Sequence, residues 1–238
     1  MTKALAALVV LCLALAGASA TMAGGRPIVV ELFTSEGCSS CPPADALLAE
    51  LASRPDILAL SFHVDYWDRL GWKDPFSSAA ATARQQRYAE LLGIGNVYTP
   101  QVVVDGRWQA VGSDRGEVER ALAAAASAPA APLRLAVTDG RAHVTLGPGA
   151  DAADAGAAAV LLVAFDRRHV DSVARGENEG RTLTHVDAVR GFAEIGGVDR
   201  KTGALDAPAP WHADRLAAIL HAPDGRVLGA AVADLNGP

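Results

Sequence analysis

The sequence predicts an α/β domain followed by a smaller β-rich, sandwich-like domain. Strand-like and helix-like segments alternate over residues 26–127, first as two strand–helix pairs and then as a hairpin with a closing helix. Residues 132–238 instead contain short β-prone runs with Asp-Gly turns between them. Alanine and proline dominate residues 123–132, which we interpret as a linker between the two domains.

Apolar periodicity and turn residues predict the elements of the first domain. Residues 28–34 are a short β-branched run typical of a buried parallel strand, and residues 57–64 are a second such run. Helical patterns cover residues 43–53, 77–92 and 114–126. Asp105 and Gly106 separate two β-prone runs at residues 101–104 and 107–111, which predicts a hairpin.

The second domain is predicted to be mostly strands. The candidates are residues 133–137, 141–146, 160–165, 183–190, 217–221 and 227–232. Residues 147–158 are rich in Ala, Gly and Asp, and we expect them to form a flexible loop. Asn178, Arg181, His185 and Arg190 lie around a polar stretch that we interpret as a solvated hairpin.

The N-terminus has the pattern of a secretory signal. Lys3 precedes an apolar run over residues 4–16, and small residues follow up to Ala20. A membrane-spanning helix needs about 20 apolar residues, and no later run reaches that length. We therefore expect residues 1–20 to be a signal peptide cleaved near Ala20, leaving a periplasmic or secreted protein without stable membrane insertion.

The formal net charge of the chain is −6. An acidic protein repels phosphate groups, so nucleic acid and anionic membrane surfaces are not expected partners. The composition gives no indication of the oligomeric state.

Two of the three cysteines lie outside the signal segment, at Cys38 and Cys41 in the stretch TSEGCSSCPP. This stretch joins a predicted strand to a predicted helix N-terminus, where unpaired N–H groups favour a thiolate. The spacing allows a Cys38–Cys41 disulfide. In a redox role, Cys38 attacks a substrate disulfide and Cys41 resolves the mixed disulfide.

Two other roles of the cysteines remain open. One is an inert disulfide; the other is a Cu(I) site of Cys38, Cys41 and His63 in an exported binding or metal-delivery module. A disulfide that closes so short a loop restrains the unfolded chain little, which favours redox chemistry. That chemistry needs no bound metal or cofactor. For His63 itself, the common role is a hydrogen-bonded group in the core.

Several longer segments carry a family resemblance. A strand, CSSC at a helix start, a later TP before a strand, a DG hairpin and a closing helix resemble thioredoxin. The segments VVELFTSEGCSSCPPAD, LSFHVDYWDRLGWKDPFSS, YTPQVVVDG and GENEGRTLTHVDAVR resemble the exported bacterial family known as domain of unknown function 1223. The resemblance implies a thioredoxin-like first domain and a periplasmic address. It is compatible with a thiol–disulfide oxidoreductase acting on protein or peptide thiols and disulfides.

The resemblance also implies roles for single residues. Pro100 matches the cis-proline of the fold, and Thr99 before it would offer backbone groups to a bound peptide. Glu31 resembles the buried acid that moves the proton of the resolving cysteine; its alternative is a hydrogen-bonded carboxylate of the strand. Trp67 and Trp72 follow a parallel strand, so they either line the substrate site or simply pack.

Overall fold

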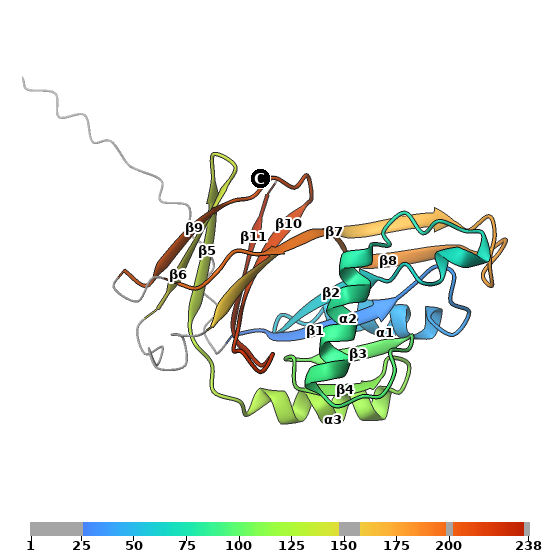
Figure 1. Cartoon of the computed structure of the whole chain (residues 1–238), viewed down its shortest axis with the longest axis horizontal. Coiled ribbons are helices and arrows are strands. Elements are labelled where there is room, and N and C mark those ends of the chain that lie inside the picture. Colours follow the sequence, from blue (N-terminus) through green and yellow to red (C-terminus); the bar gives the residue numbers. More distant parts are fainter. Residues whose placement is uncertain (1–25, 148–157, 199–201, 236–238) are drawn as a thin grey trace, which may run out of the picture.

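The computed structural model describes residues 26–147, 158–198 and 202–235 (Figure 1). The expected signal peptide at residues 1–20, its cleavage near Ala20 and most of the expected loop at residues 147–158 lie outside these ranges. Among the described residues, no helix is both long enough and apolar enough to cross a membrane.

The elements of the first half confirm the predicted order and lie within two residues of the predicted bounds. They are β1 (Ile28–Thr34), α1 (Pro42–Ala52), β2 (Ile57–His63), the 3-10 turn η1 (Asp68–Leu70), α2 (Ala79–Leu91), β3 (Gln101–Val104), β4 (Trp108–Val111) and α3 (Arg115–Ala126). Helix α1 begins with two prolines, which suit the first helical turn because its N–H groups have no helical partner. The Ser78 and Asp114 side chains cap α2 and α3 by accepting backbone N–H bonds.

The regular elements in the described part of the second half are strands, as predicted, but two of them are much longer than expected. They are β5 (Leu133–Thr138), β6 (Arg141–Leu146), β7 (Ala159–Ser172), β8 (Thr182–Glu194), β9 (Ala204–Pro208), β10 (Arg215–His221) and β11 (Val227–Asp234). The outer part of β7 is polar and largely exposed, so no apolar pattern marks it as a strand. Strand β9 was not predicted because it is only five residues long and contains Asp206 and Pro208, two residue types that are uncommon in strands.

The strands form a mixed eight-stranded sheet in the order β11-β10-β7-β8-β2-β1-β3-β4 and an antiparallel three-stranded sheet in the order β5-β6-β9. Strands β1 and β2 are parallel, β3 pairs antiparallel with β1, and β4 pairs antiparallel with β3. Strand β8 pairs with β2 in parallel at Ser61 and Ala188. The large sheet therefore contains strands from both halves, and the boundary expected at residues 127–132 does not separate it.

Three apolar clusters hold these layers together. Alternate residues of β1, such as Val30 and Leu32, pack with α1 and α3 on one face of the large sheet. Val29 and Phe33 point to the other face and pack with α2 and with strands β7, β10 and β11. A third cluster joins the small sheet to β7 and β10. Sandwich-like packing thus occurs at one end of the large sheet (Figure 1).

Candidate active site

The two cysteines lie where β1 gives way to α1, as predicted. Cys41 occupies the N-cap position of α1 with helical backbone angles, and its carbonyl accepts the Ala44 and Asp45 amides at 2.8 and 3.1 Å. The Cys41 amide in turn donates to the Cys38 carbonyl at 3.2 Å. These bonds form a tight turn that brings the two side chains together.

Cys38 and Cys41 are bonded as a disulfide. Both residues have an exposed fraction of 0%. An outside thiol therefore cannot reach either sulfur without a local movement of the chain.

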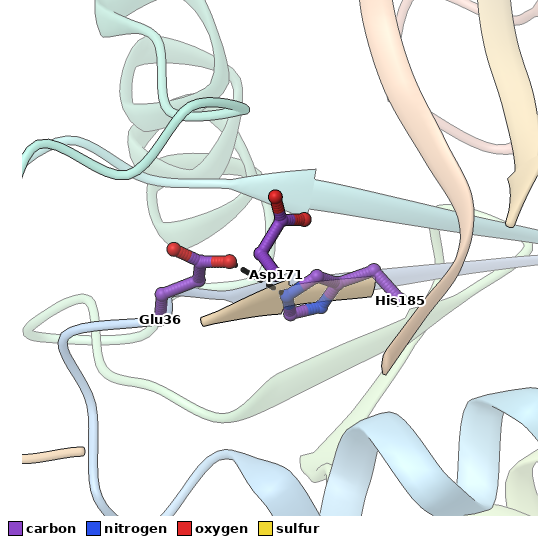
Figure 2. Close-up of side chains that lie close together, drawn as sticks. All are labelled: Glu36, Asp171 and His185. Atoms are coloured by element: carbon purple, nitrogen blue, oxygen red, sulfur yellow. Dashed lines mark hydrogen bonds and ion pairs between the residues drawn. The ribbon is translucent and has the colours of Figure 1, made fainter. Parts of the chain in front are cut away.

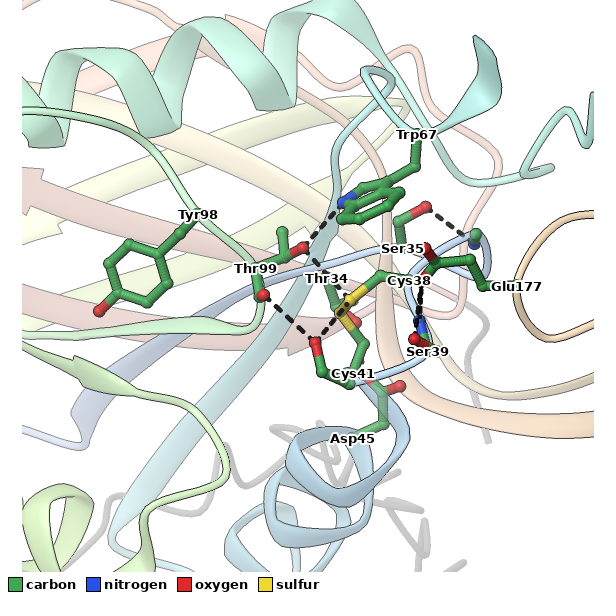
Figure 3. The surroundings of a disulfide bond; sticks show 12 residues. Thr34, Ser35, Cys38, Ser39, Cys41, Asp45, Trp67, Tyr98, Thr99 and Glu177 are labelled. Carbon is green, nitrogen blue, oxygen red and sulfur yellow. Dashed lines mark hydrogen bonds between the residues drawn. A yellow bond between two sulfur atoms is a disulfide. The ribbon is translucent and has the colours of Figure 1, made fainter. Parts of the chain in front are cut away.

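Thr99 lies directly against the disulfide (Figure 3), and the peptide bond between Thr99 and Pro100 is cis. The Thr99 hydroxyl donates to Cys38 Sγ at 3.3 Å, and the Ser40 hydroxyl lies 3.3 Å from the same sulfur. Cys38 is thus the sulfur that faces the Thr99–Pro100 turn.

Trp67 and Trp72, expected either to line the substrate site or to pack, bond residues next to the cysteine pair. The Trp67 indole N–H donates to the Thr99 hydroxyl at 2.8 Å, and Figure 3 shows the ring beside Cys38. Trp72 donates its N–H to the carboxylate of Glu36 at 2.6 Å, in the connection from β1 to α1, residues 35–41, which we call the cysteine loop. Trp67 therefore contacts Thr99, the residue expected to bind a peptide, whereas Trp72 bonds Glu36.

A segment from the C-terminal half covers the cysteine loop, which the sequence did not indicate. Asn178 is fully buried and donates to the Glu36 and Cys38 carbonyls, and Glu177 accepts from Ser39. His185 is also buried, with an exposed fraction of 1%. The interpretation of Asn178 and His185 as parts of a solvated hairpin is therefore wrong, because the β7–β8 hairpin folds back onto the loop after β1.

Two buried histidine–carboxylate pairs lie beside the loop. His63 Nδ1 is 2.7 Å from Asp74, and His185 Nε2 is 3.0 Å from Glu36. Burial alone would raise the pKa of Asp74, but His63 and the Glu36 amide lower that pKa to about 2. Burial would lower the pKa of His63, and Asp74 raises it above its ordinary value. His63 is thus a hydrogen-bonded core group, as expected.

Glu31 lies away from α1, the helix that carries Cys41. It shares the face of β1 that packs against α2, where its carboxylate accepts from Arg84 at 2.9 Å and from the Tyr88 hydroxyl at 2.6 Å. Glu31 has an exposed fraction of 0%. The arrangement favours the hydrogen-bonded carboxylate over the proton relay.

A different buried carboxylate, Asp45, lies on the cysteine side of the sheet (Figure 3). It is one helical turn after Cys41 on α1 and accepts from the Thr34 hydroxyl at 2.8 Å. Burial raises the pKa of Asp45 above its ordinary value, although His63 and His185 act in the opposite direction. Asp45 was not predicted from the sequence. Its four-residue spacing from Cys41 at the start of a predicted helix was the available signal, because such residues lie on the same helix face.

Glu36, Asp171 and His185 form the one group of potential metal ligands that lies close together in the described part of the chain (Figure 2). One ligand atom from each lies within 4.8 Å of the others, and this donor set suits a divalent cation. Glu36, however, already accepts two N–H bonds, from Trp72 and His185. Hydrogen bonding accounts for its position, and we assign no metal to the group.

The residues of the alternative copper site, Cys38, Cys41 and His63, form no such group within the described ranges. The two sulfurs are bonded to each other, and His63 bonds Asp74. The geometry therefore offers no specific support for the copper alternative.

Comparisons with known proteins agree with this description. A family model described as "Protein of unknown function (DUF1223)" matches residues 29–221. The solved structure of protein AGR_C_4864 from Agrobacterium tumefaciens is 29% identical, with a TM-score of 0.73, over 90% of this chain and 96% of that one. HBP35 of Porphyromonas gingivalis shares the fold at 14% identity, with a TM-score of 0.60 over 89% of this chain and 76% of that one. No curated protein matches.

Proposed function

Since this chain belongs to the DUF1223 family, whose description names no activity, we propose its function from the site: it is an exported thiol–disulfide oxidoreductase-like protein. The observation that carries the proposal is the Cys38–Cys41 disulfide at the start of α1, with Cys38 facing the cis-proline turn at Thr99 and Pro100. The element order from β1 to α3 supports a thioredoxin-like fold for residues 26–127.

The reaction moves two electrons between the protein and a substrate. In the reduced protein, the Cys38 thiolate attacks a substrate disulfide, one substrate sulfur leaves as thiolate, and a mixed disulfide forms. The Cys41 thiolate then attacks Cys38 Sγ and releases the second substrate thiolate. This step produces the Cys38–Cys41 disulfide found in the structure. The reverse sequence oxidises a substrate dithiol and leaves the protein reduced, so a dithiol of the same class regenerates the reduced protein after it has reduced a substrate disulfide.

The site supplies two further contributions. The Thr99 hydroxyl, 3.3 Å from Cys38 Sγ, supplies a hydrogen-bond donor to a Cys38 thiolate, whereas the two prolines that begin α1 have no N–H groups to donate. Asp45 is buried one turn from Cys41, and its raised pKa suits a group that takes the Cys41 proton during resolution and returns it during reduction. We therefore assign to Asp45 the role that the resemblance implied for Glu31.

Access to the sulfurs is the main physical requirement of this function. Because Cys38 and Cys41 are fully buried, a substrate sulfur can approach only after a local opening. An inert disulfide would have no need of such opening. The function therefore predicts a measurable rate of exchange under native conditions.

Trapping of mixed disulfides tests the proposal. In Cys41→Ala the resolving thiol is absent, so substrates should remain attached to Cys38 and appear as higher-mass bands that a reductant removes. Cys38→Ala with Cys41 intact is the matched control and should trap far less. If Cys41→Ala captures no more protein from an exported-protein extract than the Cys38→Ala control does, the proposed function is wrong.

The exported address is tested separately. Residues 1–20 carry the expected signal, and mass spectrometry of the mature N-terminus should show cleavage near Ala20. An intact Met1 on protein recovered from the expressing bacterium would contradict export.

A further inference from the structure

The connection between β7 and β8, residues 173–181, has an internal structure of its own. We refer to it as the covering segment. Backbone bonds of 2.9 Å link Val173 with Arg181 and Gly180 with Val173, which close the segment at its base. Gly176 and Gly180 have positive φ angles of 85° and 78°, which allow its tight turns. The segment is therefore a defined turn structure on the end of a long hairpin.

Asn178 attaches the covering segment to the cysteine loop. Its side-chain amide donates to the Glu36 carbonyl at 2.9 Å and to the Cys38 carbonyl at 2.8 Å. Its own carbonyl accepts from Arg181 at 2.7 Å, which fixes the orientation of the amide. The two bonds to the loop are lost if the covering segment moves away.

Glu177 makes a second attachment at the exposed side. Its carboxylate accepts from the Ser39 amide at 3.0 Å and from the Ser39 hydroxyl at 2.7 Å (Figure 3). Gly176 lies close by, such that a Cβ there would be 3.8 Å from Gly37 Cα. The covering segment thus contacts the loop on both sides of Cys38.

Apart from the Ser39 hydroxyl, the groups bound by this segment are backbone groups of the cysteine loop: two carbonyls and one N–H. An extended polypeptide forms hydrogen bonds with such groups, whereas a small thiol has few donors or acceptors to replace the bonds from Asn178 and Glu177. The Asn178 amide and the Glu177 carboxylate supply the donor and acceptor that a peptide bond would supply. The side chains therefore occupy a position suited to a peptide backbone.

We propose that the covering segment is an intramolecular occupant of the substrate site, which must be displaced before Cys38 reacts and which favours thiols carried by extended polypeptides over small thiols. The part concerning substrates rests on the proposed oxidoreductase function. The part concerning access depends only on the disulfide and its contacts.

The access part is tested by the rate at which a small phosphine reduces the Cys38–Cys41 disulfide under native conditions. Asn178→Ala removes two bonds to the loop and should accelerate reduction roughly tenfold. Glu177→Ala should accelerate it several-fold. Glu179→Gln, an exposed carboxylate change in the same segment, is the matched control and should react like the wild type.

Wild-type rates in both Asn178→Ala and Glu177→Ala would overturn the access part. Circular dichroism of each oxidised variant establishes that the fold is retained. If Asn178→Ala does not fold, Glu177→Ala decides the question, because its side chain lies at the surface. Phosphine reduction requires no turnover, so this result is independent of whether trapping on Cys38 succeeds.

The substrate part is tested with two thiols of equal pKa, a cysteine within an extended peptide and N-acetylcysteine methylamide. In the wild type the peptide should react several-fold faster, because its backbone can replace the bonds of Asn178 and Glu177. In Asn178→Ala both thiols should react at more similar rates. Equal rates for the two thiols in the wild type would overturn this part.

Discussion

Replacement of Glu31 by glutamine should strongly destabilise the protein. The Glu31 carboxylate is fully buried and receives bonds from Arg84 and Tyr88, which tie β1 to α2. Glutamine keeps the size of the side chain but leaves the Arg84 guanidinium, whose side chain is 12% exposed, without its counter-charge. Loss of one partner of a buried ion pair costs about 3–5 kcal/mol. For a chain of this length that corresponds to a fall of about 6–20 °C in Tm.

Urea unfolding of the oxidised protein, followed by circular dichroism and tryptophan fluorescence, measures this cost. Glu50→Gln provides the control, because Glu50 and Arg115 form a surface pair with side-chain exposures of 60% and 56%. That change should alter the free energy of unfolding by less than about 1 kcal/mol. A loss below about 1 kcal/mol in Glu31→Gln would refute the reasoning that this ion pair is a structural element of the core.

Three further changes test other parts of the structure. Burial raises the pKa of Asp187 from 3.8 to about 6, so the stability that comes from its protonation in the folded protein is lost as pH rises through 6. In urea unfolding, Asp187→Asn should therefore be more stable than the wild type by about 1–3 kcal/mol at pH 8 but not at pH 4. Asp45→Asn should slow the attack of Cys41 that closes the disulfide by about tenfold or more. With Ellman's reagent this step is measured as release of the second thionitrobenzoate. Equal rates of this step in Asp45→Asn and the wild type would exclude the role assigned to Asp45. Gly106→Ala places a Cβ 2.0 Å from the Gly225 carbonyl at a φ of +64°, and should cost more than about 2 kcal/mol in thermal unfolding.

The first half of the fold was predictable because its signals are local. The run at residues 28–34 is short and apolar, the Asp105-Gly106 pair adopts two positive φ angles at a hairpin turn, and Ser78 and Asp114 stand at helix starts. Each of these signals acts within a few residues. The cysteine pair was found in the same way, whereas the role of Pro100 was implied by the family resemblance.

The parts that were not predicted depend on contacts between distant segments. Asn178 bonds Glu36 across 142 residues, and no local pattern distinguishes it from a surface asparagine. The position of Glu31 was accessible in principle, because residues two apart on a strand share a face and Val29 and Phe33 point away from α1. The position of the family acid in the sequence, taken without the strand face, pointed to Glu31 and not to Asp45, the carboxylate to which we assign the proton transfer.

The pairing of β8 with β2 has a consequence for the independence of the first half. A fragment that stops at residue 127 would lose β8 and leave β2 as an open edge. It would also expose Phe33 and Phe62, which Phe165 and Ile219 help to cover in the whole chain. Such a fragment should self-associate through its bare strand and apolar face, even though it contains the whole dithiol motif and the proline turn.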